Sequence, residues 1–369
     1  MNAAAAEARR RCIERSVRDD VRALTRYDVP DAAGFIKLDA MENPYALPPD
    51  LGQALGAALS RVAINRYPDG DARAVKNALR DALSLPADAG LLLGNGSDEL
   101  IQIITSALGR SDAGVLAPDP SFVMYRRNAL MARAPFTAVA LRRDFTLDVD
   151  TMLAAIEQAR PALVFLAYPN NPTGNLFDAQ DVERIIHAAP GLVAIDEAYY
   201  AFADASFLPR VLDFPNLIVI RTVSKIGMAG LRLGYGVAHP HWIAEFDKLR
   251  PPYNVGSLAQ AALPLLLAHA DVFAEQAEAI KAERARVADA LAALGATVFP
   301  TKTNFVLARM PDADAAFAAL RDARILVKNL HGSHPLLAQC LRITVGTRSE
   351  NDALLEVLER HLMERTRRA

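Results

Sequence analysis

Residues 221–236, RTVSKIGMAGLRLGYG, combine a lysine with two arginines directly after the apolar run NLIVI. One interpretation is a strand, a turn and a helix that carry solvated charges. The other is chemical. An amine held at the carboxyl end of a buried strand can attack a carbonyl carbon, so Lys225 is a candidate nucleophile. Ser224 and Arg232 beside it could bind an anion.

Three more motifs follow apolar runs. Asp196 ends such a run in AIDEAY, where a buried carboxylate is costly unless it meets a cation or caps a helix. Asn171 lies in YPNNPTG, which also reads as an ordinary turn. GNGSDE, residues 94–99, places two glycines where a strand gives way to a helix. Backbone N–H groups there suit a phosphate, although a plain turn with Ser97 as the N-cap fits equally well.

Together, the four motifs match what pyridoxal phosphate needs from a protein. A lysine amine forms a Schiff base with the aldehyde of this cofactor, and an aspartate keeps its pyridine nitrogen protonated so that the ring accepts carbanion electrons. A glycine–serine cradle with an arginine can hold its phosphate. The sequence therefore predicts a pyridoxal 5'-phosphate site around Lys225, at the ends of several strands.

These motifs need elements that bring them to one place. Between residues 91 and 239, short runs that are apolar throughout alternate with stretches of helical period. This alternation is typical of an α/β fold in which helices flank both faces of a mostly parallel sheet. Ligands in such folds bind beyond the carboxyl ends of the strands, which is where the polar motifs fall.

The pattern changes after Pro251–Pro252. Residues 257–293 read as a long helix broken near Pro264, and strands at TNFVLARM, ILVKN and CLRITVG follow. A closing helix begins at Ser349, which forms a capping box in outline with Asp352. We therefore predict an N-terminal arm (1–45), a large cofactor-binding domain (46–256) and a small α+β C-terminal domain (257–369).

The composition excludes several classes of protein. A chain of 369 residues with 52% apolar residues can bury a large core, and its net charge of -2 gives no basic surface for nucleic acid. No run approaches the ~20 apolar residues of a membrane span, and no signal peptide is evident. Two cysteines suit free thiols in a reducing compartment. We expect a cytoplasmic protein that binds no metal, nucleic acid or membrane.

The motifs NNPTG, DEAYY, SKIGMAGLRLGY and CLRITVGT, in this order over nearly the whole chain, resemble those of fold-type I pyridoxal-phosphate-dependent aminotransferases. More narrowly, KLDAMENPY, RYPDG, PDPSF and LRITVGT are similar to the histidinol-phosphate aminotransferases of histidine biosynthesis. The resemblance implies a homodimer that interconverts histidinol phosphate plus 2-oxoglutarate with imidazole acetol phosphate plus glutamate. Aromatic amino-acid aminotransferases and phosphothreonine decarboxylases share the cofactor residues and remain alternatives.

The resemblance also implies roles for single residues at the cofactor. Lys225 would form the Schiff base and carry protons, and Asp196 would pair with the pyridinium nitrogen. Asn171 and Tyr199 would hydrogen-bond the ring hydroxylate, while Tyr125 would stack on the ring. The phosphate would be surrounded by Gly96, Ser97, Asp98, Thr222, Ser224, Arg232 and, from the second subunit, Tyr67.

Substrate binding is implied at four positions. Arg342 of CLRITVG would meet the anionic end of the substrate, and Tyr27 of LTRY would close over it. Asn43 of KLDAMENPY would contribute as well. Lys328 stands where the family has a second substrate-binding arginine, and a lysine there keeps the charge but loses the bidentate geometry.

Two other classes of function fit less well. A nicotinamide-dependent oxidoreductase would have to rely on GNGSDE, which lacks the third glycine of the dinucleotide fingerprint. A binding or regulatory protein without catalysis would need an additional domain, for which 369 residues leave little room.

Overall fold

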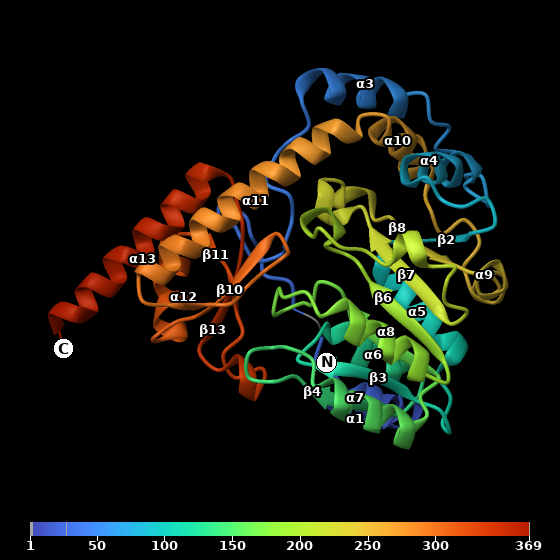
Figure 1. Ribbon diagram of the computed structural model, residues 1–369, viewed down its shortest axis with the longest axis horizontal. Coiled ribbons are helices and arrows are strands. Elements are labelled where there is room, and N and C mark those ends of the chain that lie inside the picture. The colour runs from blue at the N-terminus through green and yellow to red at the C-terminus, as the bar shows by residue number, and fades with distance from the viewer. Residues whose placement is uncertain (1–2, 27, 369) are drawn as a thin grey trace.

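The centre of the fold is a mixed β-sheet. The structure is a computed structural model, and it describes residues 3–26 and 28–368. In this part of the chain the sheet has seven strands in the order β2-β8-β7-β6-β5-β3-β4 (Figure 1). Their bounds are β2 Gly90–Gly94, β3 Val115–Asp119, β4 Phe136–Ala140, β5 Leu163–Ala167, β6 Leu192–Asp196, β7 Leu217–Thr222 and β8 Gly234–Ala238. Only β8 is antiparallel to its neighbours, so the predicted α/β fold with a mostly parallel sheet is confirmed.

Helices bury both faces of this sheet. They are α4 Arg73–Leu83, α5 Ser97–Leu108, α6 Val123–Met131, α7 Val149–Ala159, α8 Ala179–Ala188, α9 Pro240–Asp247 and α10 Ser257–Leu267. Along β6, Val193 and Ile195 pack in one cluster with residues of α4, α7, α8 and α10. Leu192 and Ala194 face the other way and cluster with residues of α5, α6 and α9. Strands buried on two sides need apolar residues at every position, which explains the unbroken runs in the sequence.

A second, antiparallel sheet follows in the chain. Its order is β12-β13-β10-β9, with β9 Thr297–Val298, β10 Phe305–Arg309, β12 Lys328–Asn329 and β13 Cys340–Thr344. Helices α11 Ala270–Ala293, α12 Ala313–Asp322 and α13 Arg348–Arg368 share its apolar core. The single strand that we predicted at ILVKN is wrong, because β11 Ile325–Leu326 pairs with β1 Ile36–Lys37 and only β12 pairs with β13. Val327 between them is buried.

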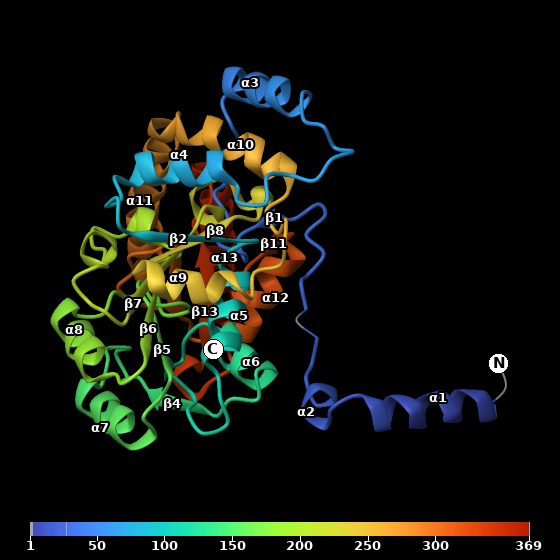
Figure 2. The same cartoon turned by 90° about the vertical axis from the view of Figure 1, so that its right-hand side faces the viewer.

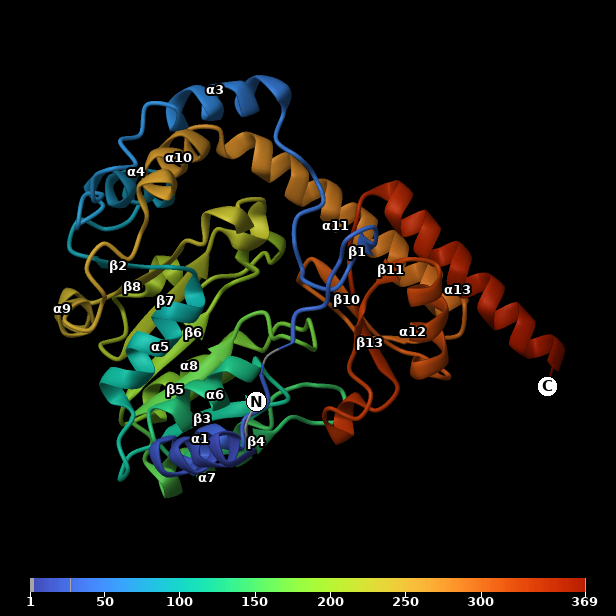
Figure 3. The same cartoon turned by 180° about the vertical axis from the view of Figure 1, so that it is seen from behind.

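The long helix predicted at residues 257–293 is broken near Pro264, as predicted, although the proline itself lies inside a helix. Pro264 lies inside α10, and the chain turns after it, at residues 268–269, by 79° into α11. Helix α10 packs on α3 Pro49–Leu59 and on α4, as Figure 3 shows. The contacts of α10 are therefore with helices of the predicted large domain, although we predicted a boundary at residue 257. The three-part division remains a prediction.

The N-terminal helices lie at the periphery. Helix α1 Ala3–Ser16 extends away from the rest of the chain (Figure 2), and α2 Asp19–Arg22 follows it. Between them, the Arg18 guanidinium donates hydrogen bonds to the carbonyls of Leu130 and Met131 at 3.1 and 3.2 Å. None of the described helices alone is both long and apolar enough to cross a membrane, while the bent pair of α10 and α11 passes that test of length and composition together.

The start of α13 differs from the prediction. The capping box is formed by Thr347 and Glu350, not by Ser349 and Asp352. The Thr347 N–H donates to Glu350 Oε2 at 2.7 Å, and the Glu350 N–H donates to Thr347 Oγ1 at 3.4 Å. Asp352 instead forms an ion pair with Arg286 of α11 at 2.8 Å. The helix therefore begins at residue 348, one residue before the predicted start.

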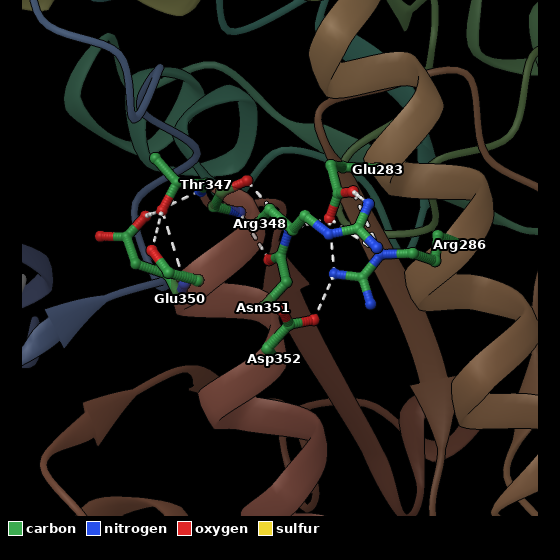
Figure 4. A network of polar contacts seen from close by, with 9 residues as sticks. Glu283, Arg286, Thr347, Arg348, Glu350, Asn351 and Asp352 are labelled. Atoms are coloured by element: carbon green, nitrogen blue, oxygen red, sulfur yellow. Dashed lines mark hydrogen bonds and ion pairs between the residues drawn. The ribbon is translucent and has the colours of Figure 1, made fainter.

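Figure 4 shows how this helix start is joined to α11. Glu283 of α11 is the hub: it accepts hydrogen bonds from Arg286 at 2.7 Å and from Asn351 Nδ2 at 3.0 Å, and it pairs with Arg348 at 3.6 Å. Asn351 in turn exchanges two hydrogen bonds with the backbone of Gly346, which follows β13. The network thereby fixes the end of β13 relative to α11.

Candidate active site

Three strands that are neighbours in the sheet carry the central residues of the site. Asn171 follows β5, Asp196 ends β6 and Lys225 follows β7, and these parallel strands end at the same edge. All three side chains line one cavity of about 100 Å³, the Lys225 cavity. Its wall contains these predicted residues: Ser97, Asp98, Asn171, Asp196, Tyr199, Thr222, Ser224, Lys225 and Arg232. The clustering expected from the sequence is therefore what the fold produces.

The start of α5 forms a cradle at this edge. Gly96 has a φ of +81°, which favours glycine, and a Cβ atom there would lie 2.8 Å from Arg232 Nη2. Gly96 itself is the N-cap, and Ser97 is the first helical residue, so the alternative with Ser97 as the N-cap is wrong. Arg232 pairs with Asp98 at 3.6 Å and donates to Ser224 Oγ at 3.3 Å. Helix N–H groups, hydroxyls and a guanidinium together suit a phosphate.

The Lys225 side chain is partly buried. Its Nζ donates a hydrogen bond to the carbonyl of Ala40 at 3.2 Å. Burial, assisted by the positive charge of Arg342, lowers the pKa of the amine to about 8. A lowered pKa increases the share of neutral amine near pH 7, and the neutral amine is the nucleophile.

Asp196 is 4% exposed. Burial raises the pKa of its carboxyl to about 6, although hydrogen bonds from the Tyr125 hydroxyl and the Ala198 N–H oppose the rise. The carboxylate thus lies where a cation would be strongly attracted, as the prediction for a pyridinium nitrogen requires.

The structure places Tyr125 differently from the prediction. Its side chain is 1% exposed, and its ring stacks on Phe165 with centroids 4.4 Å apart and planes within 2°. Its hydroxyl donates to Asp196 Oδ2 at 2.8 Å. Phe122, three residues earlier, lines the Lys225 cavity, and Tyr125 does not. The expectation that Tyr125 stacks on a cofactor ring is therefore wrong, because that ring already packs against β5; the aromatic of PDPSF itself was the missed signal.

A hydrogen-bonded chain connects the cavity to Arg342. Asn171 Nδ2 donates to the Tyr199 hydroxyl at 3.0 Å, and Arg342 Nη1 donates to Asn171 Oδ1 at 2.7 Å. Arg342 Nη2 also donates to the carbonyl of Asp39 at 3.0 Å. Residues predicted for the cofactor and for the substrate are thus directly linked.

Arg342 and Lys328 face a larger cavity of about 560 Å³, which shares Met41, Phe122 and Asn171 with the smaller one. The two cations are paired in register between β12 and β13. Two basic side chains in one wall suit a substrate with a phosphate or carboxylate.

Asn43 and Tyr67, two further predicted residues, are in neither cavity wall, and neither is Gly96 of the cradle. Asn43 Nδ2 donates to Gln276 at 2.8 Å and to the Ile226 carbonyl at 3.2 Å, so this amide joins main chain and α11. Tyr67 is 81% exposed and stacks on Tyr253 with centroids 4.6 Å apart. Tyr27 lies outside the described residues.

A buried ion pair behind the cavity was not expected from the sequence. Glu197 and Arg221 lie 2.8 Å apart, at the ends of β6 and β7. Ser206 and the Phe207 N–H also donate to Glu197, so the carboxylate is fully hydrogen-bonded. The pair ties together the strand ends that carry Asp196 and Lys225.

These residues fit pyridoxal phosphate. A partly buried lysine with a lowered pKa, a buried carboxylate and a cradle that a Cβ would fill lie around a single cavity. Lys225 would bond the aldehyde, Asp196 would face the pyridine nitrogen, and Thr222, Ser224 and Arg232 would hold the phosphate.

The sequence of this chain is similar to those of known aminotransferases. The family model described as aminotransferase class I and II matches residues 33–358. The chain is 55% identical over 345 residues to histidinol-phosphate aminotransferase 1 of Burkholderia lata, which covers 93% of this chain and 97% of that protein. It is 53% identical over 349 residues to histidinol-phosphate aminotransferase of Chromobacterium violaceum, with 94% and 98% covered.

A solved structure resembles the whole fold. Histidinol-phosphate aminotransferase from Sinorhizobium meliloti, in complex with pyridoxal-5'-phosphate, superposes with a TM-score of 0.84 at 27% identity, covering 95% of this chain and 98% of that one. The lysine, aspartate and phosphate cradle at one sheet edge are what such an enzyme needs. The chain therefore belongs to the aminotransferase class I and II family, whose members are pyridoxal-phosphate-dependent transferases of fold type I.

Proposed function

We propose that this enzyme transfers the amino group between histidinol phosphate and 2-oxoglutarate, giving imidazole acetol phosphate and glutamate, in histidine biosynthesis. The observation that carries the proposal is the position of Arg342 and Lys328, two cations in one cavity wall beside the Lys225 cavity. A phosphate dianion gains from two cations. The names of relatives at 53–55% identity support the same substrate.

The chain's own residues would divide the work. Bound pyridoxal phosphate supplies an aldehyde for the amino group and a ring that takes up electrons from Cα. Lys225 Nζ would remove and return the Cα proton, and Asp196 would hold the charge on the ring nitrogen. Arg342 would bind the anionic end of either substrate. The hydrogen bond from Arg342 to Asn171 would keep substrate and cofactor in register.

The test is a half-reaction experiment. The purified enzyme is mixed in turn with histidinol phosphate, phenylalanine, tyrosine and phosphothreonine, and the pyridoxal-to-pyridoxamine conversion is followed by absorbance. We expect fast conversion with histidinol phosphate. Faster conversion with phenylalanine or tyrosine would favour an aromatic aminotransferase. Release of carbon dioxide from phosphothreonine without conversion would favour a decarboxylase.

We also propose that the enzyme is a homodimer with shared sites. Tyr67 is exposed on one protomer, and RYPDG resembles an intersubunit cofactor contact of the family. Ile64 and Leu258 are exposed apolar residues, 82% and 50% accessible, of the kind that a partner covers. A cytoplasmic location and the lack of nucleic-acid and membrane partners remain predictions from composition.

A further inference from the structure

The hydroxyl of Tyr125 and the carboxylate of Asp196 meet from two distant elements. Tyr125 lies in the first turn of α6, and Asp196 ends β6, 71 residues later. The Oη to Oδ2 distance is 2.8 Å, and both side chains are buried. A hydrogen bond to a charged, desolvated carboxylate is among the stronger polar contacts in a protein.

The ring of Tyr125 is held so that its hydroxyl has this one direction. Phe165 of β5 stacks on it in parallel at 4.4 Å, and Phe122 contacts it edge-on at 5.6 Å. Phe122 is in the wall of the Lys225 cavity. The Tyr125 ring thus supports the cavity from behind, and its hydroxyl supports Asp196.

The groups around Asp196 differ in whether they favour its ionised or its protonated form. Oδ1 accepts the Ala198 N–H at 3.1 Å, and Oδ2 accepts Tyr125. The charges of Asp98 from α5 and of Glu197, the next residue along the chain, act in the opposite sense and favour the protonated carboxyl. Tyr125 is the side-chain donor that favours the ionised form.

We propose that Tyr125 is a positioning residue for Asp196. Tyr125 acts through its hydrogen bond to Asp196 Oδ2 and not through contact with the cofactor. The hydrogen bond keeps the carboxylate ionised and turns it toward the place of the pyridine nitrogen. The consequence for catalysis rests on the proposed role of Asp196.

The variant Tyr125→Phe removes the donor and keeps the ring. Because a hydrogen bond to a charged group contributes on the order of tenfold or more to an equilibrium constant, we expect the Asp196 carboxyl to titrate about one pH unit higher. We expect kcat to fall on the order of tenfold, while KM for the amino donor changes little, because the substrate cations are untouched.

Tyr168→Phe is the matched control. Tyr168 is 2% exposed, lies at the end of β5 and contacts Phe207 edge-on, but its hydroxyl makes no hydrogen bond with Asp196. Like Tyr125→Phe, this variant removes one hydroxyl from a buried tyrosine ring that contacts a phenylalanine. We expect its carboxyl titration and kcat to match those of the parent enzyme.

The measurement is an infrared pH titration of the apoenzyme with labelled aspartate, in which Asp196→Asn identifies the carboxyl band. Thermal unfolding of both Tyr→Phe variants checks that they are folded. A band midpoint in Tyr125→Phe equal to that of the parent would overturn the proposal, and so would an equal shift in Tyr168→Phe. This titration uses no substrate, so its outcome is separate from the half-reaction test of the proposed function.

Discussion

Asp196 is a carboxylate that the fold buries even in the apoenzyme. Its pKa is raised to about 6 from an ordinary value of 3.8. Between these values the folded apoenzyme binds the proton and the unfolded chain does not, so the free energy of unfolding falls as the pH rises through this window. At pH 7 the loss amounts to ~3 kcal/mol by the shift alone.

We therefore predict that Asp196→Asn in the apoenzyme becomes more stable relative to the parent as the pH rises from 4.5 to 7.5. Asparagine cannot ionise, so it removes the term that grows with pH. Urea unfolding of both apoenzymes at several pH values measures the difference. A difference that is constant over this range would contradict the prediction, whatever its sign.

The titrating group of Lys225 is a base with a lowered pKa, whereas Asp196 is an acid with a raised pKa. Because the amine has a pKa of about 8, its neutral form predominates above that pH. We predict that the rate at which the apoenzyme bonds pyridoxal phosphate rises from pH 6.5 and levels off above about 8, as followed by stopped-flow absorbance. Lys225→Ala should bind the cofactor without a bond that borohydride can reduce and should lack turnover. A rate that still climbs at pH 10 would indicate an ordinary lysine.

The two cations of the larger cavity should differ in their effects. Arg342→Ala should impair both half-reactions, because each substrate has an anionic end. Lys328→Ala should raise KM for histidinol phosphate on the order of tenfold and affect glutamate less, since a second cation gains more from a dianion. Separate half-reaction kinetics decide this. Equal losses for both substrates would make Lys328 an ordinary strand-end charge.

At the residue scale, the sequence predicts best those side chains that follow a strand directly. Lys225, Asp196 and Asn171 come together because the carboxyl ends of parallel strands share an edge. Tyr125 could not be placed in this way. It lies in the first turn of a helix, three residues after Phe122. Which of these two aromatic rings faces the cavity depends on the packing of Tyr125 against Phe165, and the sequence alone does not show that contact.

At the element scale, long buried strands were predictable and short elements were not. Strands β5, β6 and β7 are buried throughout, so composition alone indicates them. The segment ILVKN also starts with an apolar run, yet it divides between two sheets, because β1 from the N-terminal part of the chain pairs with its first half. Ile325 pairs with Ile36, which lies 289 residues earlier in the chain. The sequence around ILVKN carries no signal of so distant a partner.

Glu283 offers a prediction at this scale. Three side chains from α11 and the first turn of α13 converge on its carboxylate, which is largely buried. Glu283→Ala should lower the free energy of unfolding by about 2 kcal/mol, because Asn351 and Arg286 lose a charged acceptor. Urea unfolding measures the loss. Glu245→Ala, which breaks an exposed pair with Lys248, is the control and should change nothing measurable.

At the scale of the whole molecule, the proposed dimer predicts complementation between an impaired chain, Tyr67→Phe, and an inactive chain, Lys225→Ala. If Tyr67 serves the partner's cofactor, a hybrid of Tyr67→Phe and Lys225→Ala chains has one site with both lesions and one site with neither. Mixed and exchanged chains should then exceed the activity of the Tyr67→Phe parent at equal concentration of intact lysines. Native mass spectrometry confirms the exchange. Activity that only matches the share of the surviving parent would show that each site is built from one chain.

The burial of Asp196 also has a consequence for the polypeptide in a cell. A buried, ionised carboxylate weakens the apoenzyme, and a ligand that binds only the folded state restores stability in proportion to the logarithm of its concentration over Kd. Newly made chains that lack their vitamin-derived ligand thus spend more time unfolded, where proteases act. We expect the half-life of this protein to shorten when vitamin B6 is withdrawn, and a pulse-chase experiment with Asp196→Asn should show a weaker dependence.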